Sequence, residues 1–112
     1  MTLSTADTDQ TRVVTVQNER IDAALAIRFK DDMRSATQDG PTRVVLDLSQ
    51  VGFIDSSGLG AIVASMKQLS PDRSLDLAGL TPTVDKVFRL TRMDTVFTLY
   101  STLEDALDHT VG

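Results

Sequence analysis

The sequence contains no cysteine and no tryptophan, and it has a single histidine. Without cysteine the chain can form neither disulfides nor thiolate metal sites. No apolar run approaches the roughly 20 residues that a membrane-spanning helix needs, and residues 1–12 lack the basic start and apolar centre of a secretory signal. We therefore expect a cytoplasmic protein without membrane insertion.

Positive charge is also scarce, because 11 Lys and Arg residues stand against 16 Asp and Glu residues, for a formal net charge of −5. That balance argues against nucleic acid or an anionic membrane as a partner. The length of 112 residues, with 41% hydrophobic and 24% charged residues, is typical of one globular domain. We expect residues 1–112 to form a single domain without a separate catalytic lobe.

Strand and helix patterns alternate along the chain. The β-branched run in residues 12–17 predicts a strand, which can pair with residues 3–6 around Asp9 and Gln10 as a hairpin. Apolar residues then recur at helical spacing from Asp22 to the break at residues 39–41. The later predicted elements are a buried strand at 43–48, a helix with the stripe Leu59, Ile62, Val63, Met66 and Leu69, a strand at 74–80, a helix after Thr81 and Pro82, a strand at 96–100, and a helix that a Ser101–Glu104 capping box opens and that reaches Thr110.

This alternation is typical of βαβ crossovers. It predicts a single α/β domain with a mixed, mostly parallel sheet of about four to five strands, an antiparallel N-terminal edge hairpin and about four helices. In open α/β folds the functional crevice lies beyond the carboxyl ends of the strands. The loop that follows the predicted central strand at 43–48 occupies that position, so it is the candidate site.

The candidate loop, DSSGLG at residues 55–60, places an acid, two hydroxyls and two glycines at the start of a helix. Asp55 or a serine can cap the first turn, which stabilises a helix by about 1 kcal/mol. Capping does not explain the glycines, because Gly58 and Gly60 each cost a helix about 1 kcal/mol relative to Ala. The glycines predict the close approach of a neighbour or a ligand. Leu59 fits both the buried stripe and an exposed contact.

No enzyme class matches this loop. A nucleophile elbow needs GxSxG, whereas the order here is DSSG, and the single histidine, His109, lies in the last predicted helix. A phosphate-binding P-loop needs a lysine directly after its glycines, but the next lysine is Lys67. The paired acids Asp31 and Asp32 lie on a charged helical face without metal-ligand spacing. We therefore expect no catalytic residues, no metal and no cofactor.

The run from Val44 to Leu48, then Val51, then FIDSSGLG at 53–60 and an apolar helix resembles the central strand, phosphorylation loop and second helix of the STAS domain family. The resemblance is strongest to the bacterial anti-sigma factor antagonists, and it extends over about residues 10–108. Residues 19–23 are similar to the family's segment before its first helix. Asn18 stands where the family frequently has glycine, and residues 69–73 lack a glycine common before the next strand; neither departure touches the serine motif.

The resemblance implies that Ser56, the serine directly after the aspartate, is the phosphoacceptor. It further implies a partner switch. The unphosphorylated domain binds an anti-sigma factor with a histidine-kinase-like ATPase fold, which is also the serine kinase, and thereby releases a sigma factor. Phosphorylation blocks that binding, and a metal-dependent serine phosphatase restores it. The implied partner-binding residues are Asp22, Asp55, Ser57, Gly58, Leu59 and Gly60.

Other interpretations remain open at this point. Asp22 could equally cap the first helix. The same family includes accessory subunits of lipid-handling ABC transporters, for which this chain would be a cytoplasmic scaffold. Relatives have also been associated with weak nucleotide binding, although this sequence offers no P-loop, tryptophan or metal cluster for it.

Overall fold

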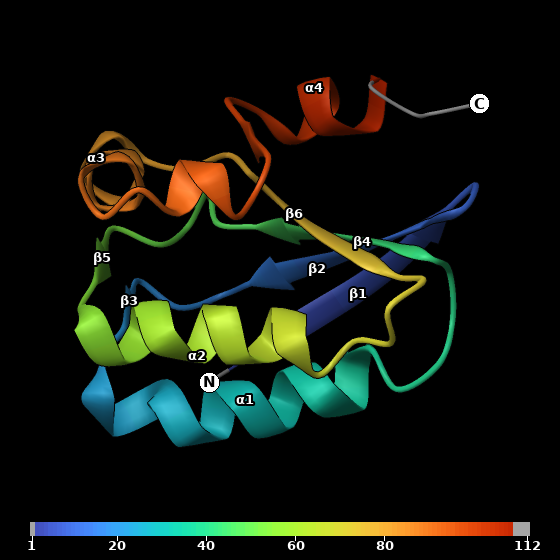
Figure 1. The fold of residues 1–112 in the computed structure, drawn as a ribbon, viewed down its shortest axis with the longest axis horizontal. Helices are drawn as coiled ribbons and strands as arrows, with labels where there is room; N and C mark the ends of the chain where they lie inside the picture. The colour runs from blue at the N-terminus through green and yellow to red at the C-terminus, as the bar shows by residue number, and fades with distance from the viewer. Residues whose placement is uncertain (1, 109–112) are drawn as a thin grey trace.

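Five strands form the central sheet of the computed structural model, which describes residues 2–108 (Figure 1). Their spatial order is β1-β2-β4-β6-β7, with β1 antiparallel to β2 and the other neighbouring pairs parallel. A separate parallel sheet joins β3 and β5. The strands are β1 Leu3–Thr8, β2 Thr11–Val16, β3 Arg20–Ile21, β4 Arg43–Asp47, β5 Phe53–Ile54, β6 Ser74–Ala78 and β7 Leu99–Tyr100.

Helices cover both faces of this sheet, with α1 and α2 on one side and α4 on the other (Figure 1). The buried Val84 and Phe88 of α3 pack in the same core cluster as α1 and α2. The predicted α/β class, the N-terminal hairpin and the parallel remainder of the sheet are confirmed. None of the helices within residues 2–108 is long and apolar enough to cross a bilayer. The helices are α1 Ala23–Ala36, α2 Ser56–Lys67, α3 Pro82–Leu90 and α4 Leu103–Asp108, with a 3-10 turn η1 at Met93–Thr95.

The central strand β4 is buried from Val44 to the end of the strand, because both faces of the sheet are covered. Val44 and Leu46 belong to the large core cluster, whereas Val45 packs with Ala78 and Ala106 on the α4 side. Parallel strands covered on both sides read as continuous apolar runs, which is why the sequence predicted this strand well.

The last predicted strand, at 96–100, was wrong in extent. Arg92 adopts a left-handed conformation with φ of 62°, and the chain then makes the η1 turn before pairing only at Leu99–Tyr100. Phe97, predicted within the strand, instead fills the core and packs edge-on against Phe88 with ring centroids 6.2 Å apart. The apolar run therefore reflects packing rather than sheet pairing.

The predicted Ser101–Glu104 capping box was also wrong. Thr102 caps α4, because its Oγ1 accepts a hydrogen bond from the Asp105 amide at 3.0 Å. The helix begins one residue later than the S-x-x-E pattern suggested, which places Thr102 at the capping position. Thr110, at the predicted end of this helix, and His109 lie outside the described residues.

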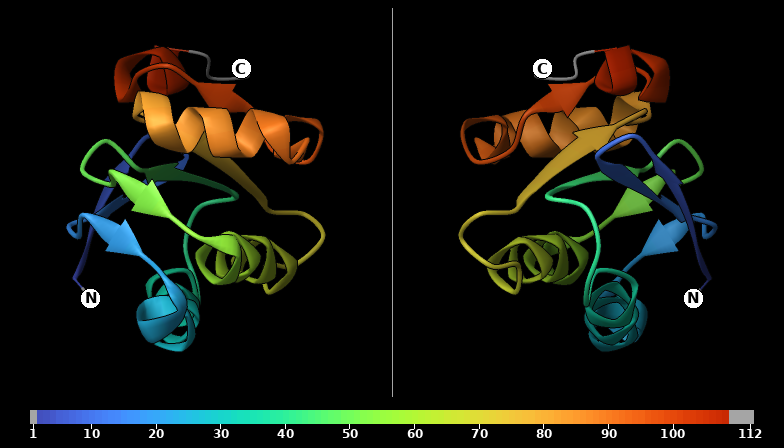
Figure 2. Two further views of the ribbon diagram at one scale, coloured as in Figure 1. Left: turned by 90° about the vertical axis from the view of Figure 1, so that its left-hand side faces the viewer. Right: turned by 90° about the vertical axis from the view of Figure 1, so that its right-hand side faces the viewer.

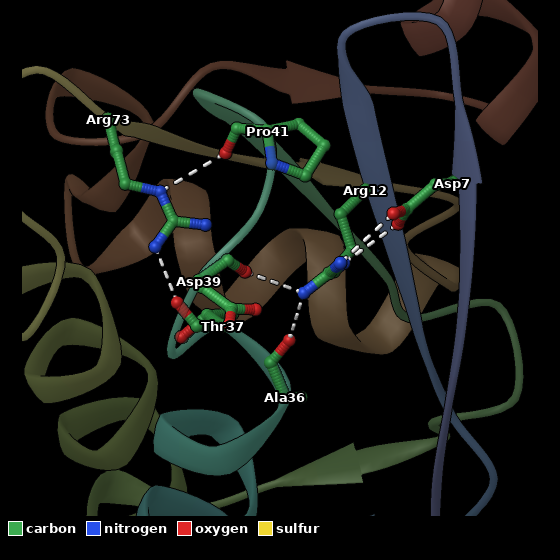
Figure 3. A network of polar contacts seen from close by, with 7 residues as sticks. All are labelled: Asp7, Arg12, Ala36, Thr37, Asp39, Pro41 and Arg73. Atoms are coloured by element: carbon green, nitrogen blue, oxygen red, sulfur yellow. Dashed lines mark hydrogen bonds and ion pairs between the residues drawn. The ribbon is translucent and has the colours of Figure 1, made fainter.

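Two arginines hold the loop that follows α1 (Figure 3). The Arg12 guanidinium forms a bidentate pair with Asp7, at 2.7 and 2.9 Å, and it also reaches back to the end of α1. Arg73 donates to the same loop from the other side. Because the last carbonyls of a helix lack intrahelical donors, these bonds complete the carboxyl end of α1. The carbonyl acceptors are Ala36 and Asp39 for Arg12, and Thr37 and Pro41 for Arg73.

The Asp7–Arg12 pair makes stability depend on pH. The hydrogen bond from Arg12 holds the pKa of the Asp7 carboxyl below its ordinary value of 3.8. A carboxyl with a depressed folded-state pKa stabilises the fold fully above its unfolded pKa and loses that contribution as the pH falls through the folded pKa. We expect Asp7→Asn to lower the melting temperature at pH 7 and to match the wild type in strong acid.

Thermal unfolding followed by circular dichroism across a pH series measures this effect. Asp9→Asn is the matched control, because Asp9 lies in the same hairpin and has no ion-pair partner within residues 2–108. A gap between Asp7→Asn and wild type that persisted unchanged into strong acid would show that Asp7 acts other than by its charge.

Candidate functional site

The candidate loop lies where the first turns of α1 and α2 meet (Figure 2, left). The strands β3 and β5 run side by side into these two helices, with Ile21 opposite Ile54 in the ladder. Both isoleucines are buried in the core, so the short ribbon is held from its inner side. The loop is therefore fixed by packing on the residues immediately before it.

A single carboxylate joins the two helix starts. Asp55 Oδ1 accepts the Gly58 amide at 2.9 Å and caps α2, which confirms the predicted cap. Asp55 Oδ2 accepts the Ala23 amide of α1 at 3.1 Å. Each bond satisfies an amide of a first helical turn, which has no acceptor within its own helix. Asp55 thus fixes the position of α1 relative to α2.

Asp22 stands at the capping position of α1, but its side chain makes no capping hydrogen bond. Asp55 supplies the acceptor that the first helix needs, so the alternative of Asp22 as a helix cap is wrong. Its Oδ2 lies 3.5 Å from the Arg20 Nε, and its Oδ1 is buried without a hydrogen-bond partner within residues 2–108. The side chain remains beside the loop, one residue before Ala23.

The two glycines have different surroundings. A Cβ on Gly58 would lie 2.0 Å from the Ile21 carbonyl oxygen, so the predicted close approach of a neighbour is confirmed there. A Cβ on Gly60 would meet no described atom within 4 Å, so no neighbour in the chain requires this glycine. The difference arises because Gly58 faces the ribbon and Gly60 faces outward on α2.

The hydroxyl residues lie on the outside. Ser56 and Ser57 are exposed in the first turn of α2, and neither side chain has a hydrogen-bond partner within residues 2–108. Leu59 is half-buried and packs against the core. The structure thus brings the predicted site residues together, with Ser56 and Ser57 outside and Gly58 inside.

The predicted stripe of α2 was only partly correct. Ile62 is fully buried, whereas Leu59, Val63, Met66 and Leu69 pack against the core while remaining partly exposed. Small residues bring α2 close to its neighbours, so the fully enclosed side chains are smaller than the periodicity suggested. The buried residues of α2 are Gly58, Ala61, Ile62 and Ser65.

Sequence reasoning missed the β3–β5 ribbon. Each strand has two residues, which is too short for an alternating pattern to be recognised. The ribbon places the Arg20 guanidinium 4.2 Å from the centre of the Phe53 ring, and Phe53 remains 38% exposed. The sequence signal available for this ribbon was the apolar pair Phe53–Ile54, which lies outside any helical stripe.

Comparison with known proteins identifies the class. The STAS domain model matches residues 2–106, and the chain therefore belongs to the STAS domain family. The anti-sigma-F factor antagonist RsfB of Mycobacterium tuberculosis is 29% identical over 107 residues, covering 96% of this chain and 87% of that protein. Regulatory anti-sigma factor antagonists are thus the homologues of this chain.

Solved structures agree. An anti-sigma factor antagonist from Mycobacterium paratuberculosis superimposes with a TM-score of 0.85 at 32% identity, over 96% of this chain and 91% of that one. The Bacillus cell fate determinant SpoIIAA in its phosphorylated form has the same fold, with a TM-score of 0.66 at 23% identity over 96% of this chain and 97% of that one.

The two glycines should respond oppositely to one substitution. Gly58→Ala forces a methyl group against a backbone oxygen, and such overpacking costs about 1–3 kcal/mol or more. Gly60→Ala enters open space and should gain about 1 kcal/mol of helix propensity. Urea denaturation of the two variants measures both values. Equal effects of the same sign would contradict the different environments described here.

Asp55→Ala should lower the free energy of unfolding by about 2 kcal/mol, because it removes acceptors from two helix starts at once. Hydrogen exchange provides the specific readout. The amides of Ala23 and Gly58 should both lose protection, although they belong to different helices. Asp22→Ala is the matched control, because that carboxylate caps neither helix. Loss of protection at Gly58 alone would rule out the bridging role.

Proposed function

We propose that this protein is an anti-sigma factor antagonist that works in a phosphorylation-controlled partner switch. In this proposal its unphosphorylated form binds an anti-sigma factor with a histidine-kinase-like ATPase fold, which then releases its sigma factor. The same partner phosphorylates Ser56 and so ends the complex, and a metal-dependent serine phosphatase removes the phosphate. The observation that carries the proposal is the exposed Ser56 at the first residue of α2.

The relatives support this assignment. RsfB is named as an antagonist of an anti-sigma factor, and the match covers nearly the whole of this chain. SpoIIAA keeps this fold in its phosphorylated form, which agrees with a switch that does not depend on unfolding. We propose that the present chain acts in the cytoplasm and is the substrate of the kinase and the phosphatase, catalysing neither step itself.

Phosphate on Ser56 should leave the domain folded. A phosphoserine adds a charge of about −1.5 to −2, and the first turn of a helix favours an anion by roughly 0.3–1 kcal/mol. The carboxylates of Asp55 and Asp22 lie nearby and oppose the new charge. Two opposing effects of similar size in an exposed position leave a small net change in stability.

The same charge has a larger effect on docking. A partner that covers the Ser56 hydroxyl would have to remove a dianion from water, and the acidic side chains beside it offer no compensation. A loss of about 3 kcal/mol weakens binding more than a hundredfold. Of the predicted contact residues, Ser57 and Gly60 are exposed beside Ser56 and can meet the same partner. Asp55 and Gly58 contribute by holding the loop in shape.

Substitutions at the two serines test the proposal. We expect Ser56→Asp to bind the purified anti-sigma factor of the same organism at least tenfold more weakly, with an unchanged circular dichroism spectrum. Ser56→Ala should bind like the wild type and take up no phosphate from the kinase and ATP. Ser57→Ala is the matched control and should still be phosphorylated.

Mass spectrometry of the phosphorylated protein locates the modified residue. Phosphate on Ser57 in the Ser56→Ala variant would move the acceptor to the neighbouring serine. Normal binding by the Ser56→Asp variant would contradict the switch. If wild-type protein bound a transporter ATPase and no anti-sigma factor, the scaffold interpretation would replace it.

A further inference from the structure

The outer face of the β3–β5 ribbon carries an exposed aromatic side chain next to the Ser56 loop. Along each strand one residue points inward and the next outward. Ile21 and Ile54 are buried in the core, whereas Phe53 is 38% exposed on the other side. Among the four phenylalanines this exposure is unusual, because the other three are all buried. They are Phe29, Phe88 and Phe97.

Arg20 covers this ring only in part. The two residues are opposite each other in the ladder, and the guanidinium lies 4.2 Å from the ring centre. An exposed cation–π contact of this kind is weak, so it leaves both side chains available to a partner. Arg20 is itself 57% exposed, and within residues 2–108 only its Nε has an acceptor, Asp22 Oδ2 at a long 3.5 Å. Most of the guanidinium donors therefore point to solvent.

We propose that the Arg20–Phe53 pair is a docking contact for the anti-sigma factor that binds at Ser56. The inference rests on the proposed function and adds where the affinity comes from. Phe53 lies three residues before Ser56 on the strand that leads into α2, so a partner covering the serine extends onto the ring. Aromatic and arginine side chains are enriched among the residues that dominate interface energies.

The chemistry of the pair specifies what the partner presents. The open part of the ring fits an apolar side chain. The unused donors of Arg20 fit a carboxylate, which a guanidinium can bind through two parallel hydrogen bonds. The partner surface therefore combines an apolar side chain with an acidic one close beside it. This contact is separate from the hydroxyl of Ser56, so affinity and control reside in different side chains.

Isothermal titration with the purified anti-sigma factor of the same organism tests the pair. We expect Phe53→Ala and Arg20→Ala each to weaken binding at least tenfold while the circular dichroism spectrum stays native. Arg20→Lys keeps the charge but loses the planar fork, so it should also bind more weakly than wild type. Leu90→Ala is the matched control, because it removes an apolar side chain that is 73% exposed at the end of α3. It should bind within twofold of the wild type.

The outcomes separate this inference from the proposed function. If the wild type binds and Ser56→Asp does not, but Phe53→Ala and Arg20→Ala both bind like the wild type, the docking contact is wrong and the switch stands. If the wild type itself does not bind, the proposed function fails first. Equal losses in Phe53→Ala and Leu90→Ala would also overturn the contact.

Self-association of the wild type that disappears in Phe53→Ala would assign the pair to a second copy of this chain instead. Should Phe53→Ala melt early, the Arg20 variants decide, since they leave the ring in place.

Discussion

One carboxylate determines how the proposed switch region is built. Asp55 accepts one amide from its own helix and another from Ala23 at the start of α1, a residue 32 positions away in the sequence. A helix start normally leaves its first amides to water or to a local cap. Here the cap of one helix also serves the other, so the two helix starts beside Ser56 are linked to each other. The close contact of Gly58 with the Ile21 carbonyl reinforces it, because no larger residue fits between α2 and the ribbon.

The elements that the sequence predicted correctly are those whose pattern comes from burial over several residues. The continuous apolar run of β4 reflects burial on both faces of the sheet, and the helical spacing of α1 reflects packing against one of them. Such packing is visible in a one-dimensional pattern. The run at 96–100 has the same composition but contributes Phe97 to the core from a turn. Composition alone cannot distinguish an apolar residue that packs from one that pairs in a sheet.

At the site, the sequence predicted which residue types are present, but it did not predict which contact each of them makes. The motif indicated a cap, two hydroxyls and two glycines, and all lie where the loop meets α2. That Asp55 reaches across to Ala23 and that Gly58 meets the Ile21 carbonyl depend on the pairing of β3 with β5. Two-residue strands carry no periodic signal, so the ribbon and its outer side chains became visible only in three dimensions.

The ribbon has one face built into the fold and another that the fold does not use. The inner-face isoleucines, Ile21 and Ile54, are buried in the core, so a substitution at either one disturbs the interior. The outward positions 20 and 53 support little of the interior and are free to diverge. If positions 20 and 53 meet the partner as proposed, two copies of such a domain in one genome can share the same serine loop and still recognise separate targets, which keeps parallel signalling circuits insulated from one another.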